Sequence, residues 1–403
     1  MAGLGRRTAG RLDFSPSPAF AGGRDSPRWP DHAPVALEHS ERARDSASAD
    51  IVRSRSAAAR QGRPPLLILE AVEEQLDAVG LGSGPADAQQ LPGGHSNATF
   101  LVRREGCEVV LRRPPRPPLP PGAHDVVREA RVMRALGDTA VPVPRILSIC
   151  EDTEPIGAPF VLMELVEGHV LEGTLPAALD LPGQRNMIGE VFVDALVEVH
   201  AVDLQATGLA AWLGRPSGYL DRQLRRFAGS WEVSRTRELP AMDELARLLR
   251  EQMPDSGAVT LVHGDARLGN AIFAPRAPAR VAALIDWEMA TLGDPLADLG
   301  YLCASWTDPR DNPPPMFHLS TLTGSPGFPT RSELVALYEQ RSGRRARHLP
   351  WYTALAFWKS AVFMEGNYRR AVYGMSDDPL LLGFRSGVEE LAELGLAALS
   401  GRS

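Results

Sequence analysis

Residues 259–286 constrain the fold more than any other segment, because short apolar runs and turn residues alternate there in a strict order. The first apolar run, 259–262, predicts a buried strand that ends at a His-Gly-Asp turn. Two further runs, 270–273 and 281–285, flank a turn-rich segment and predict a β-hairpin. The segment should therefore form a strand, a loop and a hairpin in immediate succession.

This order would bring three polar side chains to one place. Asp265 leaves the first strand on a loop, and a hairpin turn centred near residues 277–278 sets Asn270 opposite Asp286. Mg²⁺ prefers carboxylate and amide oxygens, together with water and phosphate oxygens. Transfer of a nucleotide γ-phosphate uses such an ion, while an acid beside the attacking hydroxyl accepts or orients its proton. The pattern predicts a phosphoryl-transfer centre, the alternative being three unrelated polar residues at strand ends.

Composition and charge limit the class of protein. With 403 residues, 44% of them hydrophobic and 23% charged, the chain has an ordinary globular composition and enough length for two lobes. A net charge of −7 argues against a general nucleic-acid binder, and no apolar run approaches the roughly 20 residues of a membrane helix. Three cysteines, Cys107, Cys150 and Cys303, are widely separated and odd in number. They predict neither a disulfide framework nor a zinc site, and a reducing, cytoplasmic compartment is expected.

Lys359 is the only lysine, so almost all of the positive charge is arginine. This excludes a Walker A loop, which requires a lysine, and no G-x-G-x-x-G motif opens a helix after a strand. A nucleotide must therefore bind on another scaffold.

Three motifs and one aspartate carry a resemblance to a known family. The pattern H-G-D-x4-N at residues 263–270 is followed by D-W-E at 286–288, G-D-P at 293–295 and then Asp298. Together they resemble the signature of aminoglycoside phosphotransferases and choline-kinase-like enzymes, which are small-molecule relatives of protein kinases.

The resemblance implies an α+β, protein-kinase-like two-lobed fold that uses ATP and Mg²⁺ as cofactors. It implies that Asp265 is the catalytic base and that Asn270 and Asp286 are the metal ligands. Asp298 would be a buried carboxylate that braces the catalytic loop. The partner would be a small molecule that offers a hydroxyl group, with neither nucleic acid nor membrane involved.

The chain is expected to divide into three parts. Residues 1–64 are rich in Arg, Ser, Ala, Pro and Gly without a hydrophobic period, which predicts a disordered tail. Residues 65–166 would form the N-terminal lobe with a small antiparallel sheet, and 167–403 the larger, mainly helical lobe. Helices are expected at 69–79, 125–136, 187–199, 331–342, 351–372 and 387–399. A strand, a glycine-containing turn and a second strand are expected within 91–102, and further strands at 108–112, 141–147 and 160–164. His200 is interpreted as a polar helix end.

Two short segments would contact the nucleotide by the same resemblance. A glycine-containing turn would place Ser96 and Asn97 near the phosphates, although polar hairpin turns are common and an ordinary turn is the alternative. Met163, Glu164 and Val166 would belong to the hinge, whose backbone hydrogen-bonds adenine.

Arg112 occupies the place where the family usually has a lysine on the third strand. Arginine keeps the charge and can bind phosphate in a bidentate manner, but its longer planar head changes the geometry. Strand alternation places Arg113 on the opposite face, so Arg112 is favoured. Glu129 would pair with Arg112, the alternative being a solvated pair of Arg128 and Glu129.

Further patterns narrow the resemblance. V-L-R-R-P-P at 110–115, R-E at 128–129 and L-T-G-x2-G at 322–327 resemble the kinase domains that animals fuse to acyl-CoA dehydrogenases, and their free-standing bacterial relatives. This implies a hydroxyacyl-CoA acceptor. A dense acidic cluster suited to polycationic drugs is not apparent beyond 377–378 and 389–390. A macrolide or aminoglycoside kinase, a nucleotide-binding pseudoenzyme and a metal-dependent phosphohydrolase remain alternatives.

Overall fold

The computed structural model describes residues 50–91, 97–117, 119, 124–309, 311, 321–375 and 379–401. Ala49–Ser403 form one compact unit. Residues 50–64, which the sequence assigns to a disordered tail, contain strand β1 (Ile51–Val52) and helix α2 (Arg55–Ala58). β1 pairs in parallel with β2 (Leu67–Ile68). The expectation of disorder is therefore wrong for 50–64, and the rest of that tail lies outside the described residues.

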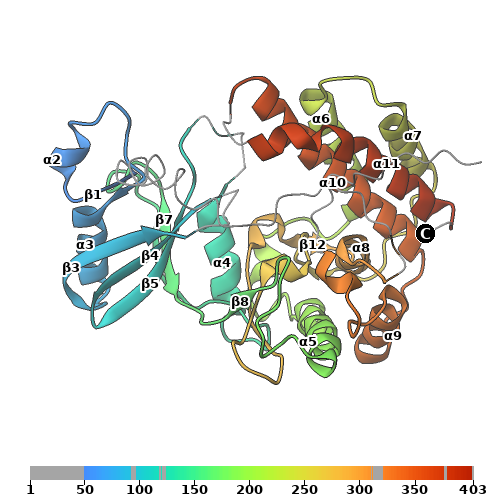
Figure 1. Cartoon of the computed structure of the whole chain (residues 1–403), viewed down its shortest axis with the longest axis horizontal. Coiled ribbons are helices and arrows are strands. Elements are labelled where there is room, and N and C mark those ends of the chain that lie inside the picture. The colour runs from blue at the N-terminus through green and yellow to red at the C-terminus, as the bar shows by residue number, and fades with distance from the viewer. Residues whose placement is uncertain are drawn as a thin grey trace, which may run out of the picture. The chain divides into compact units, whose positions relative to one another are not determined.

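The N-terminal part of this unit is built on a five-stranded antiparallel sheet with the order β3-β4-β5-β7-β6 (Figure 1). Its strands are β3 (Ser83–Gln90), β4 (Ala98–Glu105), β5 (Cys107–Arg113), β6 (Ile146–Cys150) and β7 (Phe160–Glu164). β4 and β5 meet at Gly106, which adopts a positive φ of 75°. β6 begins at Ile146, later than expected, and Pro142 and Pro144, which precede it, have no N–H group to donate to β7.

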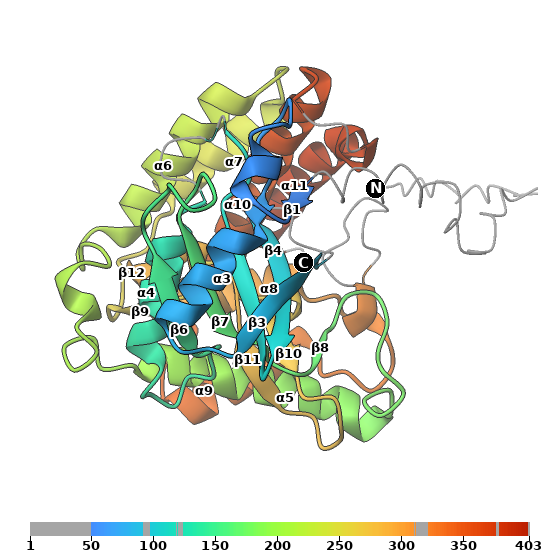
Figure 2. The same cartoon turned by 90° about the vertical axis from the view of Figure 1, so that its left-hand side faces the viewer.

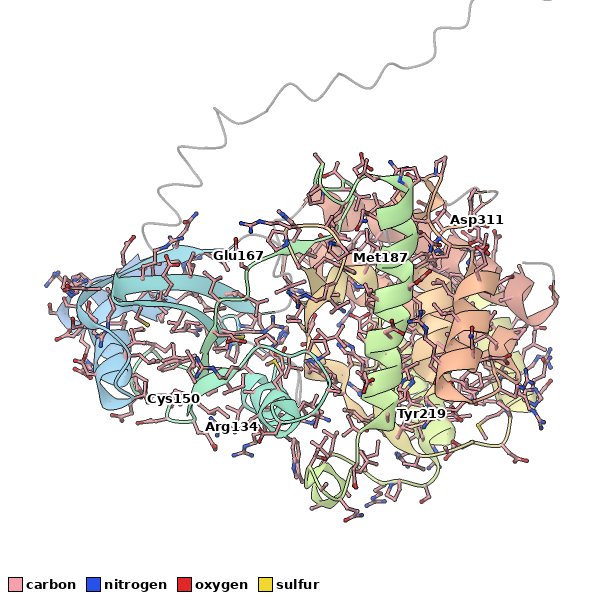
Figure 3. All side chains as sticks on the ribbon, turned by 90° about the horizontal axis from the view of Figure 1, so that it is seen from below. Arg134, Cys150, Glu167, Met187, Tyr219 and Asp311 are labelled. Atoms are coloured by element: carbon pink, nitrogen blue, oxygen red, sulfur yellow. The ribbon has the colours of Figure 1, made fainter. Side chains whose placement is uncertain are left out.

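Two helices cover opposite faces of this sheet. Along β7, Phe160 and Leu162 pack with helix α3 (Leu69–Ala78), whereas Val161 and Met163 pack with helix α4 (Val126–Leu136). Since successive strand residues point to opposite faces, the two helices lie on either side. Figure 2 shows α3 along the sheet, and Figure 3 labels Arg134 on α4 and Cys150 at the end of the contacting strand β6.

The C-terminal part is mainly helical. Its helices are α5 (Pro182–Ala201), α6 (Tyr219–Ser234), α7 (Pro240–Glu251), α8 (Leu296–Ser305), α9 (Arg331–Ser342), α10 (Leu349–Val372) and α11 (Phe384–Leu399). The sequence predicts α5, α9, α10 and α11, but α6 and α7 were not expected. In Figure 1, α10 and α11 lie side by side over α8. None of the helices in the described part of the chain is long and apolar enough to span a membrane.

Four short strands position the functional segment. β9 (Thr260–Val262) pairs with β12 (Thr291–Gly293), and β10 (Ala271–Phe273) forms the expected hairpin with β11 (Val281–Leu284). β8 (His169–Val170) adds a third strand beside β10. The hairpin register pairs Ala271 with Leu284, so Asn270 lies opposite Ile285, whose N–H donates to the Asn270 carbonyl at 2.9 Å. The prediction that Asn270 faces Asp286 is therefore wrong by one residue.

Candidate active site

The His-Gly-Asp turn after β9 is held by the buried carboxylate of Asp298, on α8. The backbone N–H groups of His263 and Gly264 donate to its two oxygens at 2.7 and 2.8 Å. Burial acts to raise the pKa of Asp298, but contacts with His200, His263 and Gly264 outweigh burial and lower it. The expected bracing role is thus supported by the geometry.

His200 differs from its interpretation as a polar helix end. It lies near the end of α5 but is buried, with Nε2 at 3.2 Å from Asp298 and Nδ1 at 2.8 Å from the Tyr338 hydroxyl. It therefore supports the carboxylate that holds the turn.

Asp265 follows this turn and remains partly exposed. Gly264 has a φ of 89°, and a Cβ atom there would lie 2.6 Å from the Met289 carbonyl oxygen, so the turn requires glycine. The side-chain amide of Asn270 donates to the backbone carbonyl of Asp265 at 2.8 Å and to its carboxylate at 2.7 Å. Asp265 and Asn270 are therefore in direct contact, as the sequence predicts for a single site.

Asp286 reaches the same place from the end of β11. It adopts a left-handed φ of 67°, and its carboxylate accepts a hydrogen bond from Arg112 Nη2 at 2.9 Å. Burial acts to lower the pKa of Arg267, but the charges of Asp265, Glu172 and Asp286 outweigh burial and raise it. Arg267 thus lies within electrostatic reach of both Asp265 and Asp286, which the hairpin brings to one region.

Arg112 links the sheet to this region. Its Nε lies 3.1 Å from Glu129 Oε2, although the pair lacks hydrogen-bond geometry and the attraction is electrostatic. Burial raises the pKa of Glu129 to about 7, while the charge of Arg112 opposes that rise. Glu129 also accepts from the Trp287 N–H at 3.2 Å. The expected pairing of Arg112 with Glu129 is therefore present.

The two alternatives on these elements are not observed. Arg113 faces away, and its guanidinium donates to the carbonyls of Leu66 and Ile156. Arg128 does not pair with Glu129 but donates to the carbonyls of Glu288 and Ala290.

The oxygen donors at this place fit Mg²⁺. The amide nitrogen of Asn270 faces Asp265, which leaves its amide oxygen for a cation, and Asp286 offers a carboxylate. No cluster of three or more His, Cys, Asp or Glu residues in the described ranges is arranged to hold a metal ion. Two protein oxygens, with water and phosphate completing the shell, match an ion that sheds its water reluctantly.

The nucleotide contacts expected elsewhere are placed less completely. Ser96 lies outside the described residues. Asn97 is buried at the start of β4, and neither polar atom of its side chain has a hydrogen-bond partner in the described chain. Met163 is a buried residue of β7, and the N–H of Glu164 donates to the Arg145 carbonyl at 3.0 Å. Val166 follows the end of β7 and is half-buried.

Sequence reasoning missed two residues beside Asp265. Tyr301, on α8, is buried, and burial together with the charge of Asp265 raises its pKa well above the usual value. Lys359, on α10, lies with Nζ at 3.5 Å from the Gly264 carbonyl oxygen. The sequence feature that could have drawn attention to Lys359 is that it is the single lysine of the chain.

Comparisons with known proteins identify the family of the chain. The model of the family described as "Phosphotransferase enzyme family" matches residues 87–331. Over 313 residues the chain is 35% identical to acyl-CoA dehydrogenase family member 10 of Mus musculus. The aligned segment covers 77% of this chain and 29% of that protein. The chain thus spans less than a third of that relative's length.

Solved structures show the same fold. A candidate aminoglycoside phosphotransferase from Ralstonia eutropha is 34% identical, with a TM-score of 0.70 and coverage of 82% of this chain and 98% of that one. A thermostable mutant of aminoglycoside phosphotransferase APH(4)-Ia, in a ternary complex with AMP-PNP and hygromycin B, is 18% identical, with a TM-score of 0.53 and coverage of 82% and 99%.

These likenesses confirm the expected protein-kinase-like, two-lobed α+β fold. The family match spans the sheet, the His-Gly-Asp turn and the hairpin that follows it. The chain therefore belongs to the phosphotransferase enzyme family.

Proposed function

We propose that this protein is a kinase that transfers the γ-phosphate of ATP, with Mg²⁺, to a hydroxyl group of a small molecule. The observation that carries the proposal is the arrangement around Asp265, which contacts Asn270, with Arg267 within reach of both Asp265 and Asp286. Membership of the phosphotransferase family supports the reaction class. Residues 65–166 would be the nucleotide-binding lobe and 167–403 the catalytic and acceptor-binding lobe.

In this mechanism Asp265 accepts or orients the proton of the acceptor hydroxyl. The Asn270 amide holds the Asp265 carboxylate in place, and Asp298 fixes the turn from behind. Asn270 and Asp286 would hold Mg²⁺, which neutralises charge on the phosphates when bound. Each group acts from a defined position, so most of the catalytic effect would come from orientation and electrostatics.

Arg112 would bind the nucleotide phosphates in place of the usual lysine. Its guanidinium is oriented by Glu129, and a planar fork can contact two phosphate oxygens at once. The relative that binds AMP-PNP supports an adenine nucleotide. Ser96 and Asn97 would contribute phosphate contacts, and Met163, Glu164 and Val166 the hinge.

For the acceptor we propose a hydroxyacyl-CoA. Relatives named as acyl-CoA dehydrogenase family members suggest a thioester substrate. Burial lowers the pKa of Arg128, the charge of Asp125 opposes that fall and the charge of Arg226 adds to it, so two cations and one carboxylate lie within electrostatic reach of one another here. A positive environment attracts the phosphates of coenzyme A and repels a polycationic aminoglycoside. Three free thiols, Cys107, Cys150 and Cys303, suit a cytoplasmic location.

A nucleotide-binding pseudoenzyme is the second candidate, favoured only by arginine at position 112. To separate the two, the full chain would be incubated with Mg-ATP and hydroxyacyl-CoA esters, the matching free hydroxy acids, a macrolide or an aminoglycoside. Mass spectrometry would then detect an added phosphoryl group. Transfer to the thioesters that disappears in Asp265→Asn supports the proposed enzyme. Nucleotide binding without transfer to any acceptor would favour the pseudoenzyme.

A further inference from the structure

Lys359 stands out because it is the single lysine of the chain, whereas every other basic residue apart from the histidines is an arginine. It lies in the middle of α10 and is buried, with only 5% of its surface exposed. Burying an ammonium group is costly unless its charge is used, and Lys359 forms no ion pair with any residue in the described ranges. The presence of a buried ammonium group at this position therefore calls for an explanation.

The ammonium group faces the catalytic turn. Nζ lies 3.5 Å from the Gly264 carbonyl oxygen, directly before Asp265. It also lies over two aromatic rings, 5.1 Å from the centroid of Phe227 and 5.8 Å from that of Tyr301. Cation–π attraction to these rings offsets part of the cost of burial. The two rings thus form a cage that holds one positive charge beside the turn.

The partners in the cage suit a lysine better than an arginine. An ammonium is a compact charge with three donors, whereas guanidinium is planar, broader and suited to flat, bidentate partners. Two rings and a single carbonyl leave no carboxylate for a guanidinium to grip. In a chain that otherwise uses arginine, lysine is therefore specific to this place.

The charges around the cage are those of the catalytic centre. Asp265 on the catalytic loop and Asp298 on α8 attract the ammonium, Arg226 on α6 repels it, and the Tyr301 phenol faces Asp265. Burial lowers the pKa of Lys359 to about 8, and the two carboxylates oppose that fall. The group is thus protonated at neutral pH and loses its charge in mildly alkaline solution.

We propose that Lys359 is a positioning residue for phosphoryl transfer, which holds the Gly264 carbonyl and thereby the place of Asp265 at the end of the turn. This inference rests on the proposed kinase function. Asp298 accepts hydrogen bonds from the backbone N–H groups of the turn, and Lys359 Nζ lies beside the Gly264 carbonyl oxygen. The turn is therefore fixed through donors and acceptors alike, from two helices.

The test compares Lys359→Met with Glu365→Gln in the full chain. Glu365 is a matched control, because it is a buried charged residue on the same helix that pairs with Arg237 at 3.0 Å. For each variant, kcat and the KM for ATP would be measured across neutral and alkaline pH, with the best acceptor of the wild type. Equilibrium binding of Mg-AMP-PNP would report the nucleotide site separately.

We expect kcat of Lys359→Met at neutral pH to fall about 10- to 100-fold, as for a displaced catalytic group, with the KM for ATP and AMP-PNP binding nearly unchanged. The wild type and Glu365→Gln should lose kcat as pH rises through about 8, and Lys359→Met should lack that decline. A Lys359→Met protein with wild-type kcat and the same alkaline decline would overturn the inference.

Two further outcomes are also decisive. If Lys359→Met does not fold, the wild-type profile decides, since a kcat that stays constant from neutral pH up to about pH 10 contradicts the role given to Lys359. If the wild type transfers phosphate to no acceptor, the proposed function fails and this inference fails with it. An active wild type beside an unaffected Lys359→Met removes the inference alone.

Discussion

Replacing Asp298 by Asn tests whether the catalytic turn depends on one buried carboxylate. The carboxylate accepts hydrogen bonds from the backbone N–H groups of His263 and Gly264, at 2.7 and 2.8 Å, and lies 3.2 Å from His200 Nε2. Asparagine has one acceptor oxygen, so its NH₂ group would face one of these N–H donors. A hydrogen bond to a charged group contributes about 1.5–3 kcal/mol, and an unpaired buried donor adds a similar cost. We expect the free energy of unfolding to fall by about 2–4 kcal/mol.

Activity should fall together with stability, because Asp265 follows the same turn. A displacement of about 1 Å at a catalytic group can cost about 100-fold in rate, so kcat should drop by at least about tenfold. Urea unfolding and steady-state kinetics would be measured for Asp298→Asn and for Asp243→Asn, an exposed aspartate on α7. The control should stay within about 0.5 kcal/mol of the wild type. Unchanged stability and kcat in Asp298→Asn would refute the bracing role.

The sign of the pH dependence follows from the same contacts. The pKa of Asp298 is lowered in the fold, so its stabilisation is fully present above the pKa of an unfolded aspartate, about 4. That stabilisation is lost as pH falls below this value through the folded pKa. Acid unfolding should therefore be less steep in Asp298→Asn than in the wild type, as followed by circular dichroism.

Two further substitutions test the site directly. Asp286→Ala should abolish binding of Mg-nucleotide, while Asp265→Ala should keep binding and remove turnover, and calorimetry with Mg-AMP-PNP separates the two. Equal nucleotide affinity in wild type and Asp286→Ala would contradict the role of Asp286. Gly264→Ala places a Cβ atom 2.6 Å from the Met289 carbonyl at a φ of 89°, so kcat and thermal stability should both drop. A wild-type melting temperature for Gly264→Ala would show that the turn can relax.

Local patterns predicted those parts of the site whose contacts are close in sequence. The apolar runs around residues 260–285 specify β9 and the β10–β11 hairpin, because strand alternation and turn residues act over a few positions. The register was missed by one residue, since it depends on how the turn is built. β6 was misplaced because the prolines before it were included in an apolar run.

Contacts between distant elements could not be predicted in this way. His200 reaches Asp298 from α5, and Lys359 reaches Gly264 from α10, and no periodicity encodes either approach. Each looks like an ordinary polar residue on its own helix. Alternation along β5 correctly predicts that Arg112 and Arg113 face opposite ways, and in the structure Arg112 is the one that lies beside Glu129 on α4.

The two acidic groups of the site are held from different parts of the fold, and this should separate binding from turnover. Asp286 is tied to the sheet through Arg112, which Glu129 on α4 orients. Asp265 is tied to the helices through Asp298 and His200. Glu129→Gln should therefore raise the KM for ATP more than it lowers kcat, because it weakens the charge that orients Arg112.

His200→Gln should show the opposite pattern. It removes one contact of Asp298 while leaving Arg112 and Asp286 in place, so kcat should fall with the KM for ATP nearly unchanged. Steady-state kinetics of both variants at several ATP concentrations would measure the split. If Glu129→Gln and His200→Gln change kcat and KM in the same proportion, the two supports are not independent. In that case the division of labour between sheet and helices inferred from these contacts is wrong.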